Sequence, residues 1–281
     1  MLDDTTSIGR FGSGREVKRI EDAGLLAGHG RYADDASLPG QLHLSFLRSP
    51  HAHARIVSID TAAAFAMPGV VAVLTGADLV ADGVKPLPVA PIFQRPDGTP
   101  GATPLRPALA HEIVRFVGEA VVALFADTLE QAKDAVEAVM VEYDELPVVV
   151  ELAQATADGA PLIWEAATGN IAAQMRHGDA AASDAAFASA AHVVALDLVN
   201  QRLIPAPMEP RSALAAYDAQ TGRITLRVST QTPSSVRDTL CNDVLGIPND
   251  KVRVVVDDVG GGFGMKTGLY PEEIVVAYGA R

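Results

Sequence analysis

The sequence predicts an α+β fold arranged in two successive units, on the basis of three observations. Short runs in which apolar and polar residues alternate indicate strands in the first half of the chain. One amphipathic helix is expected there, because Thr128 and Gln131 form a capping box before the apolar face of residues 129–139. After residue 190, a second group of strands and helices includes a glycine run at 260–264.

The first unit is predicted to span residues 21–147, behind a polar, glycine-punctuated N-terminal arm at residues 1–20. Its expected strands are 42–46, 54–58, 70–74, 114–116, 120–125 and 139–143, with Pro147 closing the last. The stretch 86–107 is rich in proline and glycine and is therefore expected to be an exposed loop. Strands, one helix and a further strand within this length indicate a compact α+β domain.

Residues 148–185 are predicted to be a connector, since they are rich in alanine and turn residues and lack clear periodicity. The second unit, 186–281, is expected to begin with a strand at 193–199. The elements expected after it are a strand pair at 213–217 and 224–229, a helix at 233–245 stopped by Gly246 and Pro248, a strand at 252–256, and a helix from Pro271 with Glu272 and Glu273 in its first turn. This last helix has no cap before Arg281, so we expect the unit to be an incomplete part of a larger domain.

Composition narrows the possible functions. Of 281 residues, 48% are hydrophobic, which is ample for a core, and the net charge is −13. Nucleic acid and anionic membranes require a basic face, so neither is an expected partner. There is no N-terminal apolar segment typical of secretion and no apolar run long enough to cross a membrane, which predicts a cytoplasmic protein. Cys241 is the one cysteine, so the chain can hold neither a disulfide nor an iron–sulfur cluster, and Cys241 itself is expected to be buried.

The run from Gly260 to Gly264, directly after an apolar strand, is the strongest functional signal. Glycine is unfavourable for packing, but it allows backbone N–H groups to approach an anionic group closely. A tight structural turn explains the same run equally well. A dinucleotide fingerprint fails, because Met265 and Thr267 stand where its last glycine belongs. A phosphate-binding P-loop fits at Lys266 and Thr267 but fails at Met265.

Four segments, in order, resemble the molybdopterin-binding large subunit of the xanthine dehydrogenase, aldehyde oxidase and aerobic carbon monoxide dehydrogenase family. They are 28–54 (GHGRY, DD, PGQLH and RSPHAHA), 117–147 (VGEAV, VEY and LP), 207–211 (PMEPR), and 229–233 (STQTP) followed by 260–264 (GGGFG). The resemblance covers nearly the whole chain. It implies that the first unit is the α/β hammerhead domain of that family and that the second is the start of its mixed α/β molybdopterin-binding domain.

The resemblance also implies roles for individual residues. Gln231 would hydrogen-bond the apical oxo group of molybdenum without being a direct ligand, and the backbone of Phe263 and Gly264 would lie against the metal and the pterin, with Gly262 supporting the loop. A neutral amide and backbone N–H groups suit an oxo ligand because they donate hydrogen bonds without adding charge. The implied cofactor is molybdenum–molybdopterin, with the cytosine dinucleotide as one form.

The resemblance implies partners as well. Iron–sulfur and FAD centres would reside on separate small and medium subunits, alongside the remainder of the large subunit, in a higher oligomer of heterotrimers. The general-base glutamate and the copper-binding cysteine of the family would lie beyond Arg281, so no catalytic residue is assigned here. Thr267 stands where xanthine-oxidising members have a purine-binding glutamate, which favours the carbon monoxide dehydrogenase-like branch.

Other polar residues are given structural roles. His51 and His53 would point the same way from a strand but lack a third metal ligand. Glu209 is expected to form a buried ion pair with Arg211 or a neighbour, and Lys266 is expected either to meet a phosphate or to be exposed.

Three functions are therefore considered. The first is a molybdenum hydroxylase large subunit that inserts water-derived oxygen into a C–H bond of an aldehyde or heteroaromatic, inactive as the isolated chain. The second is a non-catalytic scaffold or assembly module of such a complex. The third is a P-loop-like nucleotide binder.

Overall fold

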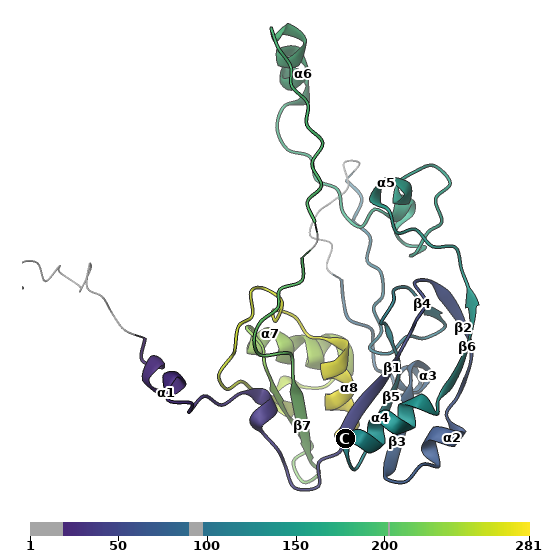
Figure 1. The fold of residues 1–281 in the computed structure, drawn as a ribbon, viewed down its shortest axis with the longest axis vertical. Helices are drawn as coiled ribbons and strands as arrows, with labels where there is room; N and C mark the ends of the chain where they lie inside the picture. Colours follow the sequence, from purple (N-terminus) through teal and green to yellow (C-terminus); the bar gives the residue numbers. More distant parts are fainter. Residues whose placement is uncertain (1–18, 90–97, 202) are drawn as a thin grey trace, which may run out of the picture.

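The computed structural model describes residues 19–89, 98–201 and 203–281. Two units lie side by side, and a long arm that carries helix α6 projects away from both (Figure 1). The predicted N-terminal arm, residues 1–20, lies almost wholly outside the described residues. No helix in the described part of the chain is long and apolar enough to span a membrane.

The first unit contains two antiparallel three-stranded sheets. One has the order β1-β5-β3, formed by His43–Arg48, Ala120–Ala126 and Val70–Thr75. The other has the order β4-β2-β6, formed by Ile113–Val114, Ala54–Asp60 and Met140–Glu145. The predicted strands are thus confirmed in position, although Phe116 lies outside β4 and is exposed. Short helices accompany them: α1 (Asp22–Leu26), a 3₁₀ turn η1 (Ala33–Asp35), α2 (Ala62–Phe65) and α3 (Gly76–Ala81).

Strand β5 is the centre of this unit. All seven of its residues are buried, as expected of an apolar run with neighbours on both edges and both faces. Phe125 and Ala123 belong to one apolar core, while Leu124 and Ala126 belong to a second core beneath helix α4 (Leu129–Glu137). The predicted capping box starts this helix: Gln131 N donates to Thr128 Oγ1 over 3.2 Å, and Thr128 N donates to Gln131 Oε1 over 3.1 Å.

The second unit has one sheet, in the order β7-β8-β9. Strands β7 (Ala213–Asp218) and β8 (Arg223–Val228) form the predicted antiparallel hairpin. Strand β9 (Val252–Val255) runs parallel to β8 after a crossover. This crossover contains α7 (Pro233–Asp238), a π-helical segment η3 (Thr239–Leu245) and a 3₁₀ turn η4 (Asn249–Lys251). Gly246, in the left-handed conformation, ends the helical segment as predicted, and Cys241 is buried within it.

Helix α8 (Pro271–Gly279) joins the two units. Ile274, Val275 and Ala277 share one core with Phe125 of the first unit. A Cβ on Gly279 would lie 2.4 Å from Phe125 Cζ, so only glycine allows this approach. Residues near the start of the chain also reach the second unit, since Arg31 N donates to Asp258 Oδ2 over 2.9 Å. The second unit is therefore held to the first through α8 and through the segment near Arg31.

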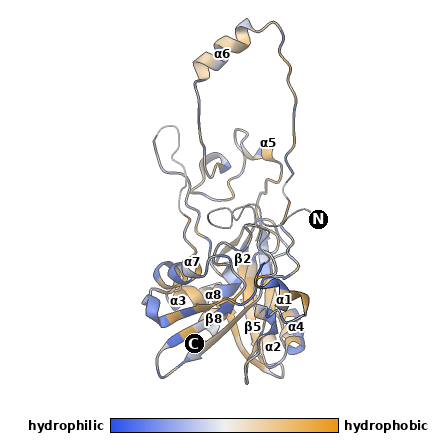
Figure 2. Cartoon of the chain, turned by 90° about the vertical axis from the view of Figure 1, so that its left-hand side faces the viewer, coloured by the Kyte–Doolittle hydropathy of each residue, from blue (hydrophilic) through white to orange (hydrophobic). Residues whose placement is uncertain are grey.

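The predicted connector is more structured than expected near its start. It contains α5 (Leu152–Ala155) and a 3₁₀ turn η2 (Thr168–Asn170). The Asn170 side chain bonds Ile163 N, Ala155 O and Pro161 O, and the Arg115 guanidinium stacks on the Trp164 ring at 4.0 Å. Helix α6 (Ala180–Ser189) follows, far from the body (Figure 2).

Two expectations about loops and strands differ from the structure. The strand predicted at 193–199 does not form, and the segment is exposed coil with no partner strand among the described residues. The loop 86–107 is not wholly exposed: Leu87 is buried and pairs with Arg106, although residues 90–97 lie outside the described part. Local pattern gave the strand signal at 193–199, but a strand also needs a neighbour to bond to.

Candidate cofactor site

The predicted site residues come together where the loop between β9 and α8 meets Gln231, which lies between β8 and α7. This glycine loop, residues 260–266, places Gly261, Phe263 and Gly264 at positive φ, with values of 101°, 49° and 82°. Phe263 is a bulky residue in a conformation that such residues rarely adopt, and it is 75% exposed. Backbone strain of this kind gathers at functional sites, so the loop is shaped for more than a turn.

Two glycines of the loop are required by close contact instead of by φ. A Cβ on Gly260 would lie 2.4 Å from Glu209 Cβ, and one on Gly262 would lie 2.4 Å from Gln231 Cδ. The loop backbone is therefore pressed against Glu209 on one side and against Gln231 on the other. Any side chain at these two positions would have to displace the residue that it meets.

The Gln231 side chain holds the outer part of the loop. Its Oε1 accepts from Gly264 N over 3.1 Å and from Lys266 N over 3.3 Å, while Gln231 N donates to Lys266 O over 2.8 Å. Backbone N–H groups are donors, so the atom that they meet is the amide oxygen. The Nε2 group consequently stays available as a donor, and none of the described residues accepts a hydrogen bond from it.

A buried polar cluster holds the base of the loop. Lys266 is fully buried, and its Nζ donates to Glu209 Oε2 (2.9 Å), Glu209 O (2.9 Å) and Ser229 Oγ (2.8 Å). Glu209 Oε2 also accepts from Ser229 Oγ and from Gly260 N, each over 2.7 Å. Glu209 and Lys266 thereby tie the first and last residues of the glycine loop together.

The charge state of Glu209 follows from these contacts. Burial acts to raise its pKa, but hydrogen bonds from Ser229, Lys266 and Gly260 outweigh burial and hold the pKa below its ordinary value. Glu209 is thus an anion paired with a buried cation. Its second oxygen, Oε1, is buried and has no hydrogen-bond donor among the described residues.

A second ion-pair group lies at the start of α8. Glu272 bonds Arg48 of the first unit at 2.9 Å and Arg211 of the second at 3.4 Å, and Arg211 stacks on the Tyr270 ring at 3.7 Å. Burial acts to raise the pKa of Glu272. The hydrogen bond from Arg48 and the positive charges of Arg48 and Arg211 contribute to a net effect that lowers the pKa below its ordinary value. The adjacent Glu273 is buried without a cation in hydrogen-bond contact, and burial raises its pKa to about 7.

The structure corrects two predictions about charged residues. Glu209 pairs with Lys266, not with Arg211, which bonds Glu272 instead. Lys266 is neither exposed nor free to meet a phosphate, because all three of its N–H donors are used inside the protein. This removes the residue on which a P-loop interpretation depends.

The histidines take structural positions. His53 is buried and its Nδ1 lies 2.7 Å from Pro147 O, while His51 pairs with Glu145 at 3.5 Å and contacts the Tyr143 ring. In the described part of the chain, no group of three or more His, Cys, Asp or Glu side chains could hold a metal ion.

Sequence reasoning missed Ser229 and Tyr270. Ser229 stands two residues before Gln231 and joins the buried pair, while the Tyr270 hydroxyl donates to Met265 O. Ser229 lies in the segment 229–233 that resembles the family, at the end of a predicted strand, but neither signal indicated its contact with the buried pair. Nothing in the sequence indicates the Tyr270 contact, because it depends on how α8 meets the loop.

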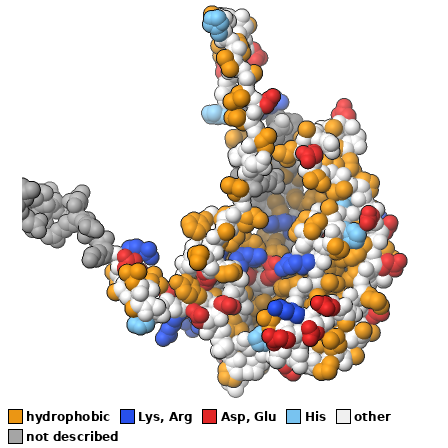
Figure 3. All heavy atoms as spheres, in the orientation of Figure 1, with side chains coloured by type: hydrophobic (Ala, Val, Ile, Leu, Met, Phe, Trp, Pro, Cys, Tyr) orange, Lys and Arg blue, Asp and Glu red, His pale blue; other side chains and the backbone are white. Residues whose placement is uncertain are grey.

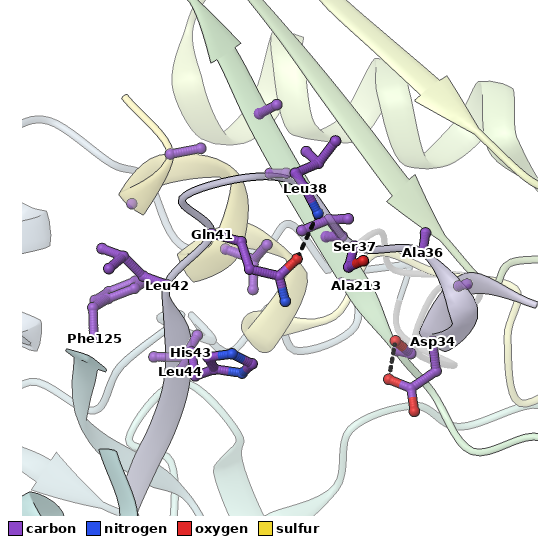
Figure 4. A pocket seen from close by; sticks show the side chains of 18 of the residues that line it. Asp34, Ala36, Ser37, Leu38, Gln41, Leu42, His43, Leu44, Phe125 and Ala213 are labelled. Atoms are coloured by element: carbon purple, nitrogen blue, oxygen red, sulfur yellow. Dashed lines mark hydrogen bonds between the residues drawn. The ribbon is translucent and has the colours of Figure 1, made fainter. Parts of the chain in front are cut away.

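A hollow lies elsewhere, along the seam between the two units. It has a volume of about 790 Å³ and runs between residues 33–46, strand β7 and the last turn of α8 (Figure 4). Polar contacts at its wall include Leu38 N donating to Gln41 Oε1, Ser212 Oγ donating to Asp34 Oδ1 across the two units, and Arg211 Nη1 donating to Glu272 Oε2. None of Gln231, Gly262, Phe263 and Gly264 lines it, so it is separate from the glycine loop.

Both units match known families. Residues 27–147 match the family model for the aldehyde oxidase and xanthine dehydrogenase a/b hammerhead domain. Residues 163–281 match the molybdopterin cofactor-binding domain. The fold and the loop thus define a protein with a hammerhead domain and at least part of a molybdopterin-binding domain.

Individual relatives agree with this assignment. The chain is 40% identical over 265 residues to the carbon monoxide dehydrogenase large chain of Hydrogenophaga pseudoflava, covering 89% of this chain and 31% of the relative. It is 38% identical over 273 residues to the nicotine 6-hydroxylase large subunit of Paenarthrobacter nicotinovorans, covering 95% and 32%. Its fold matches the crystal structure of quinoline 2-oxidoreductase from Pseudomonas putida 86 with a TM-score of 0.85 and 40% identity, covering 95% of this chain and 33% of that one.

The chain belongs to the xanthine dehydrogenase, aldehyde oxidase and carbon monoxide dehydrogenase family of molybdopterin-binding large subunits. It spans about a third of the length of each of these three relatives.

Proposed function

We propose that this chain forms part of the cofactor site of a molybdenum hydroxylase large subunit, in the carbon monoxide dehydrogenase-like branch. The complete enzyme would insert a water-derived oxygen into a C–H bond of an aldehyde or heteroaromatic substrate. The observation that carries the proposal is the arrangement of Gln231, whose Oε1 is fixed by the loop and whose Nε2 has no acceptor among the described residues. Similarity to carbon monoxide dehydrogenase and nicotine 6-hydroxylase large subunits supports the class of enzyme.

The residues present fit molybdenum–molybdopterin. When bound, this group supplies two-electron redox chemistry. Gln231 Nε2 would donate a hydrogen bond to its apical oxo group without adding a charge, and the exposed backbone at Phe263 and Gly264 would lie against the metal and pterin. Gly262 lets Gln231 reach this position, and the buried Glu209–Lys266 pair keeps the loop in shape. The pterin form proposed is the cytosine dinucleotide.

No residue of this chain is proposed as the catalytic base. We propose that the remainder of a large subunit contributes it, along with most pterin contacts. Thr267 turns its hydroxyl onto Gly264 O over 2.9 Å, so it supports the loop instead of facing a substrate, which fits a non-purine substrate. The likeness to a nicotine hydroxylase and a quinoline oxidoreductase supports a heteroaromatic.

Partners follow from the same proposal. The single cysteine leaves no place for an iron–sulfur cluster in this chain. We therefore propose a small iron–sulfur subunit and a medium FAD subunit as cytoplasmic partners, in an oligomer of heterotrimers. The relatives' own names, "large chain" and "large subunit", support the existence of smaller chains.

The test is the molybdenum content of the complex purified from cells that co-express the neighbouring genes, measured by elemental mass spectrometry. We expect stoichiometric molybdenum, and a large loss of it in Gln231→Leu. The matched control is Gln220→Leu, which alters an exposed glutamine in the β7–β8 turn. Metal-free protein in all three preparations would exclude the hydroxylase and favour the scaffold.

A further inference from the structure

The glycine loop has a third attachment besides the buried Glu209–Lys266 pair and Gln231. The hydroxyl of Tyr270, the residue before α8, donates a hydrogen bond to Met265 O. Met265 O and Lys266 N belong to one peptide group, and the N–H of that group donates to Gln231 Oε1 over 3.3 Å. Tyr270 and Gln231 therefore bind opposite sides of a single peptide unit.

A peptide group transmits orientation from one side to the other because it is planar. In the trans form, which the 265–266 peptide adopts, the C=O and N–H bonds point in opposite directions. A rotation that turns the C=O of this group away from Tyr270 also turns its N–H away from Gln231. The tyrosine hydroxyl thus fixes the direction of one of the two N–H groups that hold Gln231 Oε1, the other being that of Gly264.

Tyr270 is itself held at its backbone and at its ring. Its N–H donates to Glu273 Oε2 over 3.1 Å, and the Arg211 guanidinium lies over its ring at 3.7 Å. Pro271 follows, and it restricts the backbone of Tyr270 to the extended region in which that residue is found. A hydroxyl on a side chain held in this way has a defined position.

The support behind Tyr270 extends to the first unit. Arg211, which stacks on the tyrosine, donates to Glu272 over 3.4 Å, and Glu272 accepts a hydrogen bond from Arg48 of β1 over 2.9 Å. Basic and acidic side chains gather on the face where the two units meet (Figure 3). The Glu272 side chain is 23% exposed, so salt screens these ion pairs less than it screens fully exposed ones. The contacts therefore form a continuous chain from the hammerhead domain to the peptide behind Gln231.

A simpler role for Tyr270 is to begin helix α8, but that role does not need the hydroxyl. The contact with Glu273 is made by the backbone N–H, and stacking against Arg211 is made by the ring. A phenylalanine would keep both. The contact that the structure gives to the hydroxyl itself is the one to Met265 O in the glycine loop.

We propose that Tyr270 is a positioning residue for Gln231. Its hydroxyl orients the 265–266 peptide, this peptide holds Gln231 Oε1, and Nε2 is thereby left for a bound group. That the bound group is an oxo group of molybdenum rests on the proposed function, whereas the positioning of Gln231 does not. In this role Tyr270 touches neither metal nor substrate, and it acts through the loop.

The first test is nuclear magnetic resonance of the full 281-residue chain, prepared without cofactor. The sequence has no Met–Lys pair other than Met265–Lys266, so labelling with carbonyl-¹³C methionine and ¹⁵N lysine selects the signal of this peptide. In Tyr270→Phe we expect the Met265 carbonyl signal to move upfield, because its hydrogen bond is lost. The Lys266 N–H is expected to exchange with deuterium on the order of 10-fold faster, which corresponds to the net contribution of one hydrogen bond.

Tyr278→Phe is the matched control. It removes the same atom from the same helix, at a position where the hydroxyl donates to Asp82 Oδ2 instead of to the loop. Tyr278 lies roughly two turns, or about 12 Å, further along the helix. We expect the Met265 carbonyl signal and the exchange of Lys266 N–H to stay unchanged in this variant. Urea denaturation of the wild type and both variants corrects for any difference in global stability.

The side-chain amide of Gln231 reports the second step. In protein labelled with ¹⁵N glutamine, its NH₂ signals are identified by their absence in Gln231→Leu. We expect these signals to shift and to broaden in Tyr270→Phe, because one of the two bonds to Oε1 is weakened. In Tyr278→Phe they are expected to stay as in the wild type.

In the co-expressed complex, Tyr270 and Gln231 are expected to act as one unit. Tyr270→Phe should increase the rate at which molybdenum is lost during dialysis on the order of 10-fold, as for other residues that orient the groups around a metal. Gln231→Leu should increase it further. The double variant is expected to lose molybdenum no faster than Gln231→Leu, because a residue that acts through Gln231 has no effect once that side chain is gone.

Three results would each overturn the proposal: an unchanged Met265 carbonyl signal in Tyr270→Phe, an unchanged Gln231 side-chain signal in the same variant, or equal changes in Tyr278→Phe. A double variant that loses molybdenum faster than Gln231→Leu would show that Tyr270 acts independently of Gln231, and would overturn it too. If the wild-type complex holds no molybdenum, the proposed function fails, while the measurements on the cofactor-free chain still decide whether Tyr270 positions Gln231.

Discussion

The ammonium group of Lys266 is enclosed on all sides and gives its three hydrogen bonds to Glu209 and Ser229. Taking one partner away leaves a buried charge without compensation, which costs far more than the net contribution of an intact pair. Lys266→Met is therefore expected to lower the free energy of unfolding by about 3–5 kcal/mol, measured by urea denaturation. The exposed Lys133→Met serves as the control. If Lys266→Met combined with Glu209→Gln were no more stable than Lys266→Met alone, this account would be wrong.

Gly262 gives a second prediction about a single residue. In Gly262→Ala the new Cβ would fall 2.4 Å from Gln231 Cδ, so the amide must move. We expect a loss of stability of about 1–3 kcal/mol, by overpacking, and reduced molybdenum retention in the assembled complex. Gly268→Ala, where no heavy atom lies within 4 Å, is the matched control. Equal metal content in the two variants would contradict the role given to Gln231.

The raised pKa of Glu273 predicts that the stability of the protein depends on pH. Its pKa in the folded protein is raised by burial to about 7, well above its ordinary value near 4.5. The folded state thus favours the protonated acid. The contribution of Glu273 to the free energy of unfolding is therefore complete below about pH 4.5 and is lost as pH rises through about 7. The loss is on the order of 3 kcal/mol. Glu273→Gln is expected to flatten this part of the stability curve, measured by thermal unfolding between pH 5 and 8. An unchanged slope would contradict the prediction.

Among individual residues, the family resemblance was sufficient to single out Gln231, Gly262, Phe263 and Gly264, and the structure brings these four together. Their role toward a cofactor stays a prediction. The buried partners were not predictable in the same way. Lys266 and Glu209 are far apart in sequence, and only the folding of the loop onto β8 shows that a lysine in a glycine-rich stretch is internal.

Among the helices, α4 offers a clear test of local structure. Thr128 Oγ1 accepts a hydrogen bond from Gln131 N and so satisfies one of the free N–H groups of the first turn. Thr128→Ala is expected to destabilise the protein by about 1 kcal/mol. Thr61→Ala removes the same groups at the start of α2, where the side chain makes no capping hydrogen bond. A smaller effect for Thr128→Ala than for Thr61→Ala, in the same denaturation assay, would refute the capping role.

Helices and strands were predicted correctly where their sequence signals act between residues that are close in the chain. Capping residues, glycine stops and two-residue alternation act within a few positions, so α4, the β7–β8 hairpin and the end of η3 were predictable. The prediction of a strand at 193–199 was wrong, because a strand must pair with another segment that can be distant in the sequence. Helix α6 has no amphipathic pattern that could have indicated it in the sequence. In the structure all its residues are exposed.

The apolar core that the two units share predicts how a protease cleaves the protein. The projecting arm is exposed, whereas residues 213–281 are held to the first unit through α8, Phe125 and the Arg48–Glu272 ion pair. Brief proteolysis is expected to cut first within 173–208 and to leave two fragments that remain associated. Native mass spectrometry measures this directly. Fragments that separate at once would show that the seam between the units contributes little stability.

The sharing of strand β5 between two cores also bears on how the chain folds as it is synthesised. One face of this strand is covered by α4, which follows it immediately. The other face carries Phe125, which contacts α8 near Gly279. Contacts between such distant positions form slowly, because a long loop must close first. Until α8 leaves the ribosome, this face of the central strand lacks part of its apolar cover. We therefore expect the nascent protein to depend on chaperones during that interval, even though its first unit looks complete by itself.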